Sequence, residues 1–131
     1  MGDGTEIGRV RGLGSAHEGA DAWWHHKISA GSNLVLVLWF LISLALLPAY
    51  DYATITGWLA QPLAAVPLIL LVVSVFYHFH HGLTVVIEDY QHDHTRFVLL
   101  VLLKYFTIAT ATLAIFSILK VAFTATAGAA L

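Results

Sequence analysis

The sequence predicts an all-α membrane protein whose three transmembrane helices form part of a multi-subunit helical bundle. Hydrophobic residues make up 59% of the 131 residues, charged residues only 11%, and the mean hydropathy is +0.80. A soluble domain carries roughly 25% charged residues, so this chain has too few charges to cover a surface that faces water. Insertion into a lipid bilayer removes the need for such a surface.

Three long apolar segments are separated by short polar connections, and each segment is long enough to cross a bilayer. A helix of about 20 residues spans the hydrocarbon core. The predicted spans are residues 28–50, 62–88 and 97–123. The chain is therefore expected to consist of a polar N-terminal segment at 1–27 and a three-helix transmembrane domain at 28–131.

Basic residues gather on one side of the predicted spans. Arg9, Arg11 and Lys27 precede the first span and Arg96 lies in the second connection, whereas the first connection has no Lys or Arg. Because cytoplasmic segments carry an excess of basic residues, we expect the N-terminus in the cytoplasm and the C-terminus outside it. Residues 1–27 lack an apolar stretch that leads to a cleavage site, so we expect no signal peptide.

The composition also excludes several kinds of site. Cysteine is absent, which rules out disulfides, thiolate zinc sites and iron–sulfur clusters held by this chain. A net charge of −2 argues against binding to nucleic acid. Any metal must therefore be held by histidine, by carboxylates or by a cofactor, and the chain contains eight histidines.

The second span contains a cluster of histidines, His78, His80 and His81, followed by Gly82. Ionisable residues in a membrane helix are costly to bury, and they face a protein interior, a water-filled cavity or a bound ligand. Neutral imidazole is a good iron ligand. Each histidine either makes a hydrogen bond to another helix or binds a cofactor, and three histidines within four positions favour the cofactor.

Helical geometry separates these candidates. At about 100° per residue, Gly82 and Asp89 return to the face of His78, whereas His80 points to the other side. His78 and Asp89 are eleven residues apart, which corresponds to about three turns or roughly 16 Å along the axis. Gly82 leaves room for a flat macrocycle to approach the backbone. From the residues alone, Asp89 and the adjacent Tyr90 are best interpreted as anchors at the membrane interface.

These residues resemble the signature of the smaller, hydrophobic membrane anchor of succinate dehydrogenase (respiratory complex II). The signature reads His78-x-His80-x-Gly82-Leu83, followed by Val86-x-x-Asp89-Tyr90-x-His92. Residues 12–19 and the motif Trp23-Trp24-x-x-Lys27-x-Ser29-Ala30 look like the approach to the first span in alphaproteobacterial members. The resemblance implies an anchor subunit in a bacterial inner membrane, with its C-terminus in the periplasm.

Part of what the resemblance implies concerns haem b. His78 would be an axial ligand of the iron, with Gly82 beside the macrocycle. Lys27, where the family usually has an arginine, would lie near the haem propionates or the quinone pocket. The histidines outside the cluster belong to segments at the membrane interface, so we expect none of them opposite His78. The second axial ligand is therefore expected on the larger cytochrome b anchor subunit.

The rest concerns ubiquinone and the assembly. Tyr90 would donate a hydrogen bond to a quinone carbonyl, with Asp89 orienting it, and no residue of this chain would be catalytic alone. A flavoprotein subunit would oxidise succinate and an iron–sulfur subunit would pass the electrons on, as in the respiratory chain and the tricarboxylic acid cycle. The chain's partners would be these two subunits, the larger anchor and membrane lipids.

Several alternatives remain open on the sequence alone. The same architecture suits an anchor of fumarate reductase or of another b-type cytochrome, because the direction of electron flow depends on redox potentials. A channel or transporter subunit would use the histidines for protons, although three short spans without an internal repeat do not favour it. Lys104 in the third span either extends to the lipid headgroups or pairs with a haem propionate or Asp89.

Overall fold

The computed structural model describes residues 5–7 and 19–128. All the regular secondary structure in these residues is helical. Its main elements are α2 (Gly19–Ala45), α3 (Tyr52–Leu59), α4 (Pro62–Tyr90) and α5 (Asp93–Gly128). The three long helices α2, α4 and α5 are apolar enough to cross a membrane. The predicted all-α membrane fold is therefore confirmed, and the chain is a multi-pass membrane protein.

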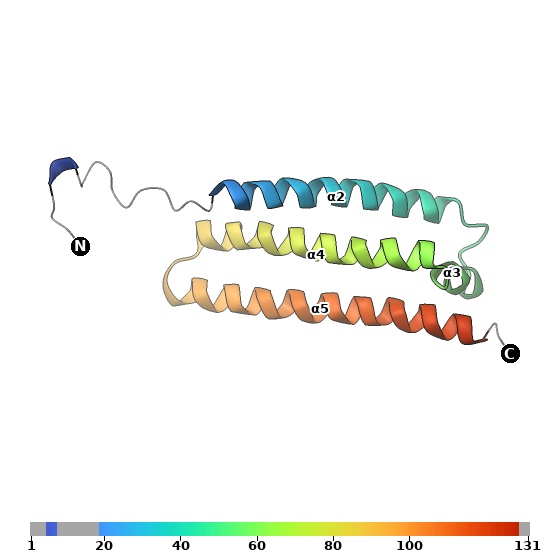
Figure 1. Ribbon diagram of the computed structural model, residues 1–131. Helices are drawn as coiled ribbons and strands as arrows, with labels where there is room; N and C mark the ends of the chain where they lie inside the picture. The colour runs from blue at the N-terminus through green and yellow to red at the C-terminus, as the bar shows by residue number, and fades with distance from the viewer. Residues whose placement is uncertain (1–4, 8–18, 129–131) are drawn as a thin grey trace.

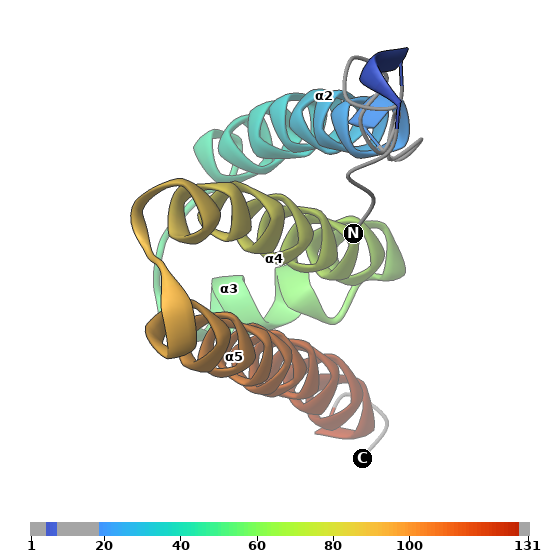
Figure 2. The same ribbon diagram turned by 90° about the vertical axis from the view of Figure 1, so that its left-hand side faces the viewer.

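The long helices form one open layer with α4 in the middle. α4 packs against α2 on one side and against α5 on the other, whereas α2 and α5 do not pack against each other (Figure 1, Figure 2). The short α3 lies at one end of the layer and contacts α4 and α5. In the described part of the chain, the outer helices are therefore positioned relative to one another through α4 and through α3, whose Trp58 ring lies 6.3 Å from that of Trp39 on α2.

The two ends of the layer are formed by different parts of the chain. The start of α2 and the α4–α5 connection lie at one end, while α3 and the end of α5 lie at the other (Figure 1). Near the first of these ends, a guanidinium nitrogen of Arg96 lies 3.1 Å from a carboxylate oxygen of Glu88. Neighbouring long helices thus run in opposite directions, as expected for three successive membrane spans. The assignment of the first end to the cytoplasm stays a prediction.

The helices extend past the predicted spans at this end. α2 begins at Gly19 rather than near residue 28, and only Gln91 and His92 separate α4 from α5. Asp93 has a φ of 60°, a left-handed conformation that Asp adopts more readily than most residues, and the chain reverses direction there. Hydropathy marks where a segment enters the hydrocarbon, but helical hydrogen bonding continues beyond that point when no residue interrupts it.

Few apolar side chains are buried within this single layer. Among the described residues, the buried apolar side chains are Ala64, Ala65, Leu71 and Leu103. Large apolar side chains on all three long helices are exposed. Such a surface has to be covered by lipid or by another protein chain.

The first connection contains a short helix that hydropathy alone did not predict. The Asp51 carboxylate caps α3 by accepting hydrogen bonds from the hydroxyl of Thr54 at 2.5 Å and from its backbone N–H at 3.4 Å. The hydroxyl bond, which favours the ionised carboxylate, is the main reason that the pKa of Asp51 is lowered. The cap is therefore strongest above the carboxyl's unfolded pKa, and it is lost as the pH falls through the lowered value.

Asp51→Ala removes both acceptor oxygens, and it should loosen α3 without disturbing the long helices. Asp51→Asn keeps a capping oxygen and should retain most of the helix. We expect amide hydrogens of α3 to exchange several-fold faster in Asp51→Ala, as measured by mass spectrometry in detergent micelles. Asp21→Ala, in the first turn of α2, is the control, and equally faster exchange along α4 would contradict a local capping role.

Candidate functional site

His78 lies on the side of α4 that faces α2. Its Nδ1 atom is 3.0 Å from the hydroxyl oxygen of Ser29 on α2. Its ring packs against the ring of His26, with centroids 4.6 Å apart and planes inclined by 30°. Ser29 is only 5% exposed and His78 is half-buried. Polar side chains therefore join α2 to α4 at this point of their interface.

His26, which the sequence placed in the segment before the first span, lies against His78. Hydropathy placed the start of the first span near residue 28 and left His26 in the segment before it. Because α2 begins at Gly19, the helix runs through His26 and brings its ring onto α4. The contact depends on how α2 and α4 are aligned along their axes, which the periodicity of a single helix does not specify.

A groove of about 350 Å³ opens between the first turns of α2 and the last turns of α4. It is lined by Trp23, His26, His81, Gly82 and Val85. A Cβ atom on Gly82 would meet nothing within 4 Å, so the space in front of this residue is open. Gly82 thus lies on an open surface one turn beyond His78, where the helical period predicted it.

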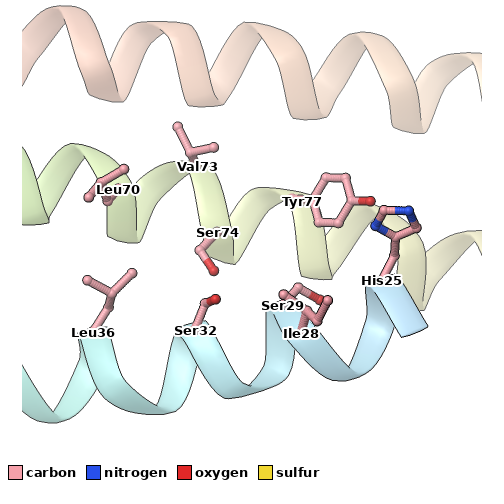
Figure 3. Close-up of a pocket in the computed structure, with 9 residues that line it drawn as sticks. All are labelled: His25, Ile28, Ser29, Ser32, Leu36, Leu70, Val73, Ser74 and Tyr77. Atoms are coloured by element: carbon pink, nitrogen blue, oxygen red, sulfur yellow. The ribbon is translucent and has the colours of Figure 1, made fainter. Parts of the chain in front are cut away.

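A second groove, of about 370 Å³, follows the interface between α2 and α4 (Figure 3). His25 and Tyr77 lie at one end, and Ser32 and Ser74 extend toward one another near its middle (Figure 3). The Ser74 hydroxyl is buried, and it has no hydrogen-bond partner in the described part of the chain. Ser29 also lines this groove, so hydroxyl groups follow the interface away from His78.

His80 and His81 both line a groove between α4 and α5, and His81 also lines the groove at Gly82. The Nδ1 atom of His80 is 3.2 Å from the hydroxyl of Thr84, and the groove between α4 and α5 has a volume of about 400 Å³. The Nδ1 atom of His81 is 3.2 Å from the carbonyl oxygen of Tyr77, and the two rings are 4.3 Å apart. His80 therefore faces away from α2, as the helical period predicts.

Asp89 and Tyr90 form the end of α4 and are exposed, with 77% of Tyr90 accessible. Within residues 5–7 and 19–128, neither side chain makes a hydrogen bond or an ion pair, and the nearby carboxylate of Glu88 pairs with Arg96. The two side chains are thus available to groups outside this chain. The continuous helix holds them in a fixed register with His78.

The structure does not bring Lys27 into this group. Its Nζ atom is 5.8 Å from the ring centroid of Trp23, one turn earlier on α2, where a cation is attracted to the aromatic face. Lys27 precedes Ser29 by two residues, or about 200° of helix, so it points away from α4. Lys104 is also exposed, and it forms no ion pair with Asp89 in the described part of the chain.

The whole chain resembles known membrane subunits. The family described as "Succinate dehydrogenase/Fumarate reductase transmembrane subunit" matches residues 1–127, which include the three long helices up to the last turn of α5. The chain belongs to this family. The resemblance drawn from the histidine and Asp-Tyr motifs is therefore confirmed.

Named relatives lie in the alphaproteobacterial genera Rickettsia and Paracoccus. The succinate dehydrogenase hydrophobic membrane anchor subunit of Rickettsia bellii is 32% identical over 107 residues, which cover 81% of this chain and 86% of the relative. The protein of the same name from Paracoccus denitrificans is 28% identical over 111 residues, covering 85% and 86%. No solved structure matches the chain. The relatives are thus anchor subunits of an enzyme complex.

Gly82→Ala should stabilise the complete chain in detergent micelles, because the new Cβ atom enters open space and alanine favours the helix. The expected gain is roughly 0.5–1 kcal/mol, as for glycine to alanine elsewhere in helices. Denaturant unfolding followed by circular dichroism measures it. Gly57→Ala in α3, where the space is also open, is the matched control. A loss of stability in Gly82→Ala alone would show that the groove is closed there.

Proposed function

We propose that this chain is the membrane anchor of a succinate:quinone oxidoreductase, in which it holds one side of a haem b and contributes to a ubiquinone site. The observation that carries the proposal is the register of α4, which combines a half-buried His78, an open groove at Gly82 and an exposed Tyr90 at its end. The names of the relatives from Rickettsia and Paracoccus support the same complex.

The residues around His78 fit the requirements of a haem. Within the described residues, no three His, Asp or Glu side chains come together to hold a metal ion. A haem needs only axial ligands from the protein, because its macrocycle supplies the other four nitrogens. His78 is a half-buried imidazole, and the groove beside Gly82 is open on the next turn. The bound haem would supply a one-electron carrier close to the quinone.

His26 does not take the place of a ligand from another subunit in this packing. Two imidazoles on opposite sides of one metal have ring centroids roughly 6 Å apart, given metal–nitrogen distances of about 2 Å. The centroids of His26 and His78 are only 4.6 Å apart, with ring planes inclined by 30°, which leaves too little room for a metal between them. The second axial ligand is therefore proposed to be a histidine of the larger cytochrome b anchor subunit.

Tyr90 is the proposed hydrogen-bond donor to a ubiquinone carbonyl. A donor that is already in place stabilises the negative charge that develops on the carbonyl oxygen during reduction. Asp89, the adjacent residue at the end of α4, is proposed to orient this phenol. Lys27 is proposed to reach a haem propionate or the quinone. Its position on the far side of α2 would place that contact at an interface with another subunit.

The open layer supports assembly with the larger anchor, the iron–sulfur subunit and the flavoprotein subunit. Its apolar surface is mostly uncovered, and its two outer helices meet only α4 and α3. The iron–sulfur subunit is proposed to dock at the end of the layer that carries Tyr90. That end would face the cytoplasm, with the chain in a bacterial inner membrane.

An anchor of a fumarate reductase is the second candidate, because the description of the matching family includes both enzymes. The two enzymes differ in the direction of electron flow, which redox potentials determine. Both rates are measured on the purified complex with its flavoprotein. Fumarate reduction far faster than succinate oxidation would favour the second candidate. The channel or transporter alternative has no support in the family match.

His78→Ala should remove or strongly perturb the haem, while His80→Ala should leave its spectrum unchanged. The two histidines lie two residues apart on the same helix, but His80 faces the α5 side and bonds to Thr84. Optical spectra of the purified complex give the haem content per flavin. The reverse result would move the ligand to His80, and full haem retention in both variants would exclude this cluster.

Tyr90→Phe should slow ubiquinone reduction at least tenfold, as expected for the loss of one preorganised donor. Oxidation of succinate with an artificial acceptor that bypasses the quinone should keep its wild-type rate. Tyr52→Phe is the matched control, because Tyr52 is 84% exposed at the opposite end of the layer. An unchanged quinone rate in Tyr90→Phe would remove Tyr90 from the site.

A further inference from the structure

We propose that Ser29 is a positioning residue for His78. It holds the imidazole in the tautomer that carries its proton on Nδ1, and thereby leaves the Nε2 lone pair free to bind iron. The inference rests on the proposed haem ligation by His78. It assigns a function to a side chain of α2 that would not itself touch the haem iron.

The Ser29 hydroxyl has two partners and one hydrogen. Its oxygen is 3.0 Å from the carbonyl oxygen of His26 and 3.0 Å from Nδ1 of His78. A carbonyl can only accept a hydrogen bond, whereas a hydroxyl donates one and accepts through its lone pairs. Donation to the carbonyl of the preceding turn is a common local bond of helical serine. Both contacts are then hydrogen bonds only if Nδ1 carries the proton and donates it to Ser29.

The other tautomer would break one of these two bonds. With the proton on Nε2, the carbonyl of His26 and Nδ1 of His78 would compete as acceptors for a single hydroxyl hydrogen. Ser29 is 5% exposed, so water does not readily replace the missing bond. The geometry therefore favours the Nδ1–H form before any haem binds.

Ser29 differs from the other hydroxyl groups with a local bond in the described long helices because its imidazole partner lies on another helix, whereas the imidazole beside Thr84 is that of His80 on the same helix. Several of those hydroxyls donate to the carbonyl four residues earlier on their own helix, namely Thr84, Thr107, Thr110, Ser117 and Thr124. Ser29 donates to the carbonyl three residues earlier and also reaches an imidazole on another helix. It thus links the α2 backbone to the candidate ligand on α4.

The Nδ1–H form is the one that an Nε2 iron ligand requires. The bond to Ser29 selects the nitrogen that remains available, and it restricts rotation of the ring together with the packed ring of His26. A hydrogen bond accepted from Nδ1–H also makes Nε2 more basic, which strengthens its bond to a metal. Ser29 would act on the haem through the orientation and basicity of His78.

The first test measures the tautomer in the complete chain, purified without haem in detergent micelles. With ¹⁵N-labelled histidine, the wild type and Ser29→Thr should show His78 protonated on Nδ1, whereas Ser29→Ala should move a large fraction of the proton to Nε2. Ser32→Ala is the matched control, because it removes a hydroxyl from the same interface three residues away. An Nε2–H wild type, or a tautomer unchanged by Ser29→Ala, would overturn the proposal.

The second test uses the assembled complex. Ser29→Ala should weaken haem binding roughly 10- to 100-fold, the usual effect of removing the partner of a metal-bound histidine. It should also raise the haem reduction potential, because a less basic ligand stabilises ferric iron less. Ser29→Thr should restore both properties. Unchanged haem affinity and potential in Ser29→Ala would overturn the effect on haem.

His78→Ala separates this inference from the proposed function. If the haem spectrum survives in that variant, the proposal that His78 binds the haem is wrong, and so is the proposed effect of Ser29 on the haem. The tautomer measured in the haem-free chain still decides whether Ser29 positions the ring. If His78→Ala removes the haem but Ser29→Ala changes neither tautomer nor potential, only the role of Ser29 fails.

Discussion

The central position of α4 determines where each candidate site residue can act. α2 and α5 both pack along it and not against each other, so it is the main link between the two outer helices. In lipid, a helix satisfies its backbone hydrogen bonds internally, which keeps the register along α4 even though the layer buries few side chains. That register connects His78, inside the interface with α2, to Tyr90, exposed at the helix end.

The interface between α2 and α4 is more polar than packing requires. Close contact between spans is achieved at lower cost by small apolar residues, such as Ala65 of α4, which is buried and lines a groove between α4 and α5. The interface between α2 and α4 instead contains the bond between Ser29 and His78 and the hydroxyl of Ser74, which has no hydrogen-bond partner in the described part of the chain. Polar groups in a membrane interior are costly, so packing alone does not explain their concentration near His78.

Sequence reasoning predicted what depends on one helix and missed what depends on two. Hydropathy located the three spans, and the helical period placed Gly82 beside His78 and directed His80 to the other side. The contacts of His26 and Ser29 with His78 depend on the packing of α2 on α4, which no single-helix pattern specifies. The start of α2 was missed because hydropathy reports entry into the hydrocarbon. The short helix α3 was also not predicted, although Asp51 three residues before Thr54 is a pattern that favours the start of a helix.

An anchor that supplies one axial ligand has an incomplete haem site until its partner arrives. Under the proposed function, the haem binds the assembled pair of anchors far better than it binds either chain alone. A ligand that binds only one state stabilises that state by mass action, so haem binding would favour the assembled complex. The open layer fits this linkage, because its uncovered apolar surface contributes nothing to a haem site until another chain packs against it. The contact between Ser29 and His78, in contrast, lies within this chain and needs no partner. The part of the haem site that this chain supplies would therefore be ordered before assembly. The complete site would form only when the partner chain supplies the second ligand.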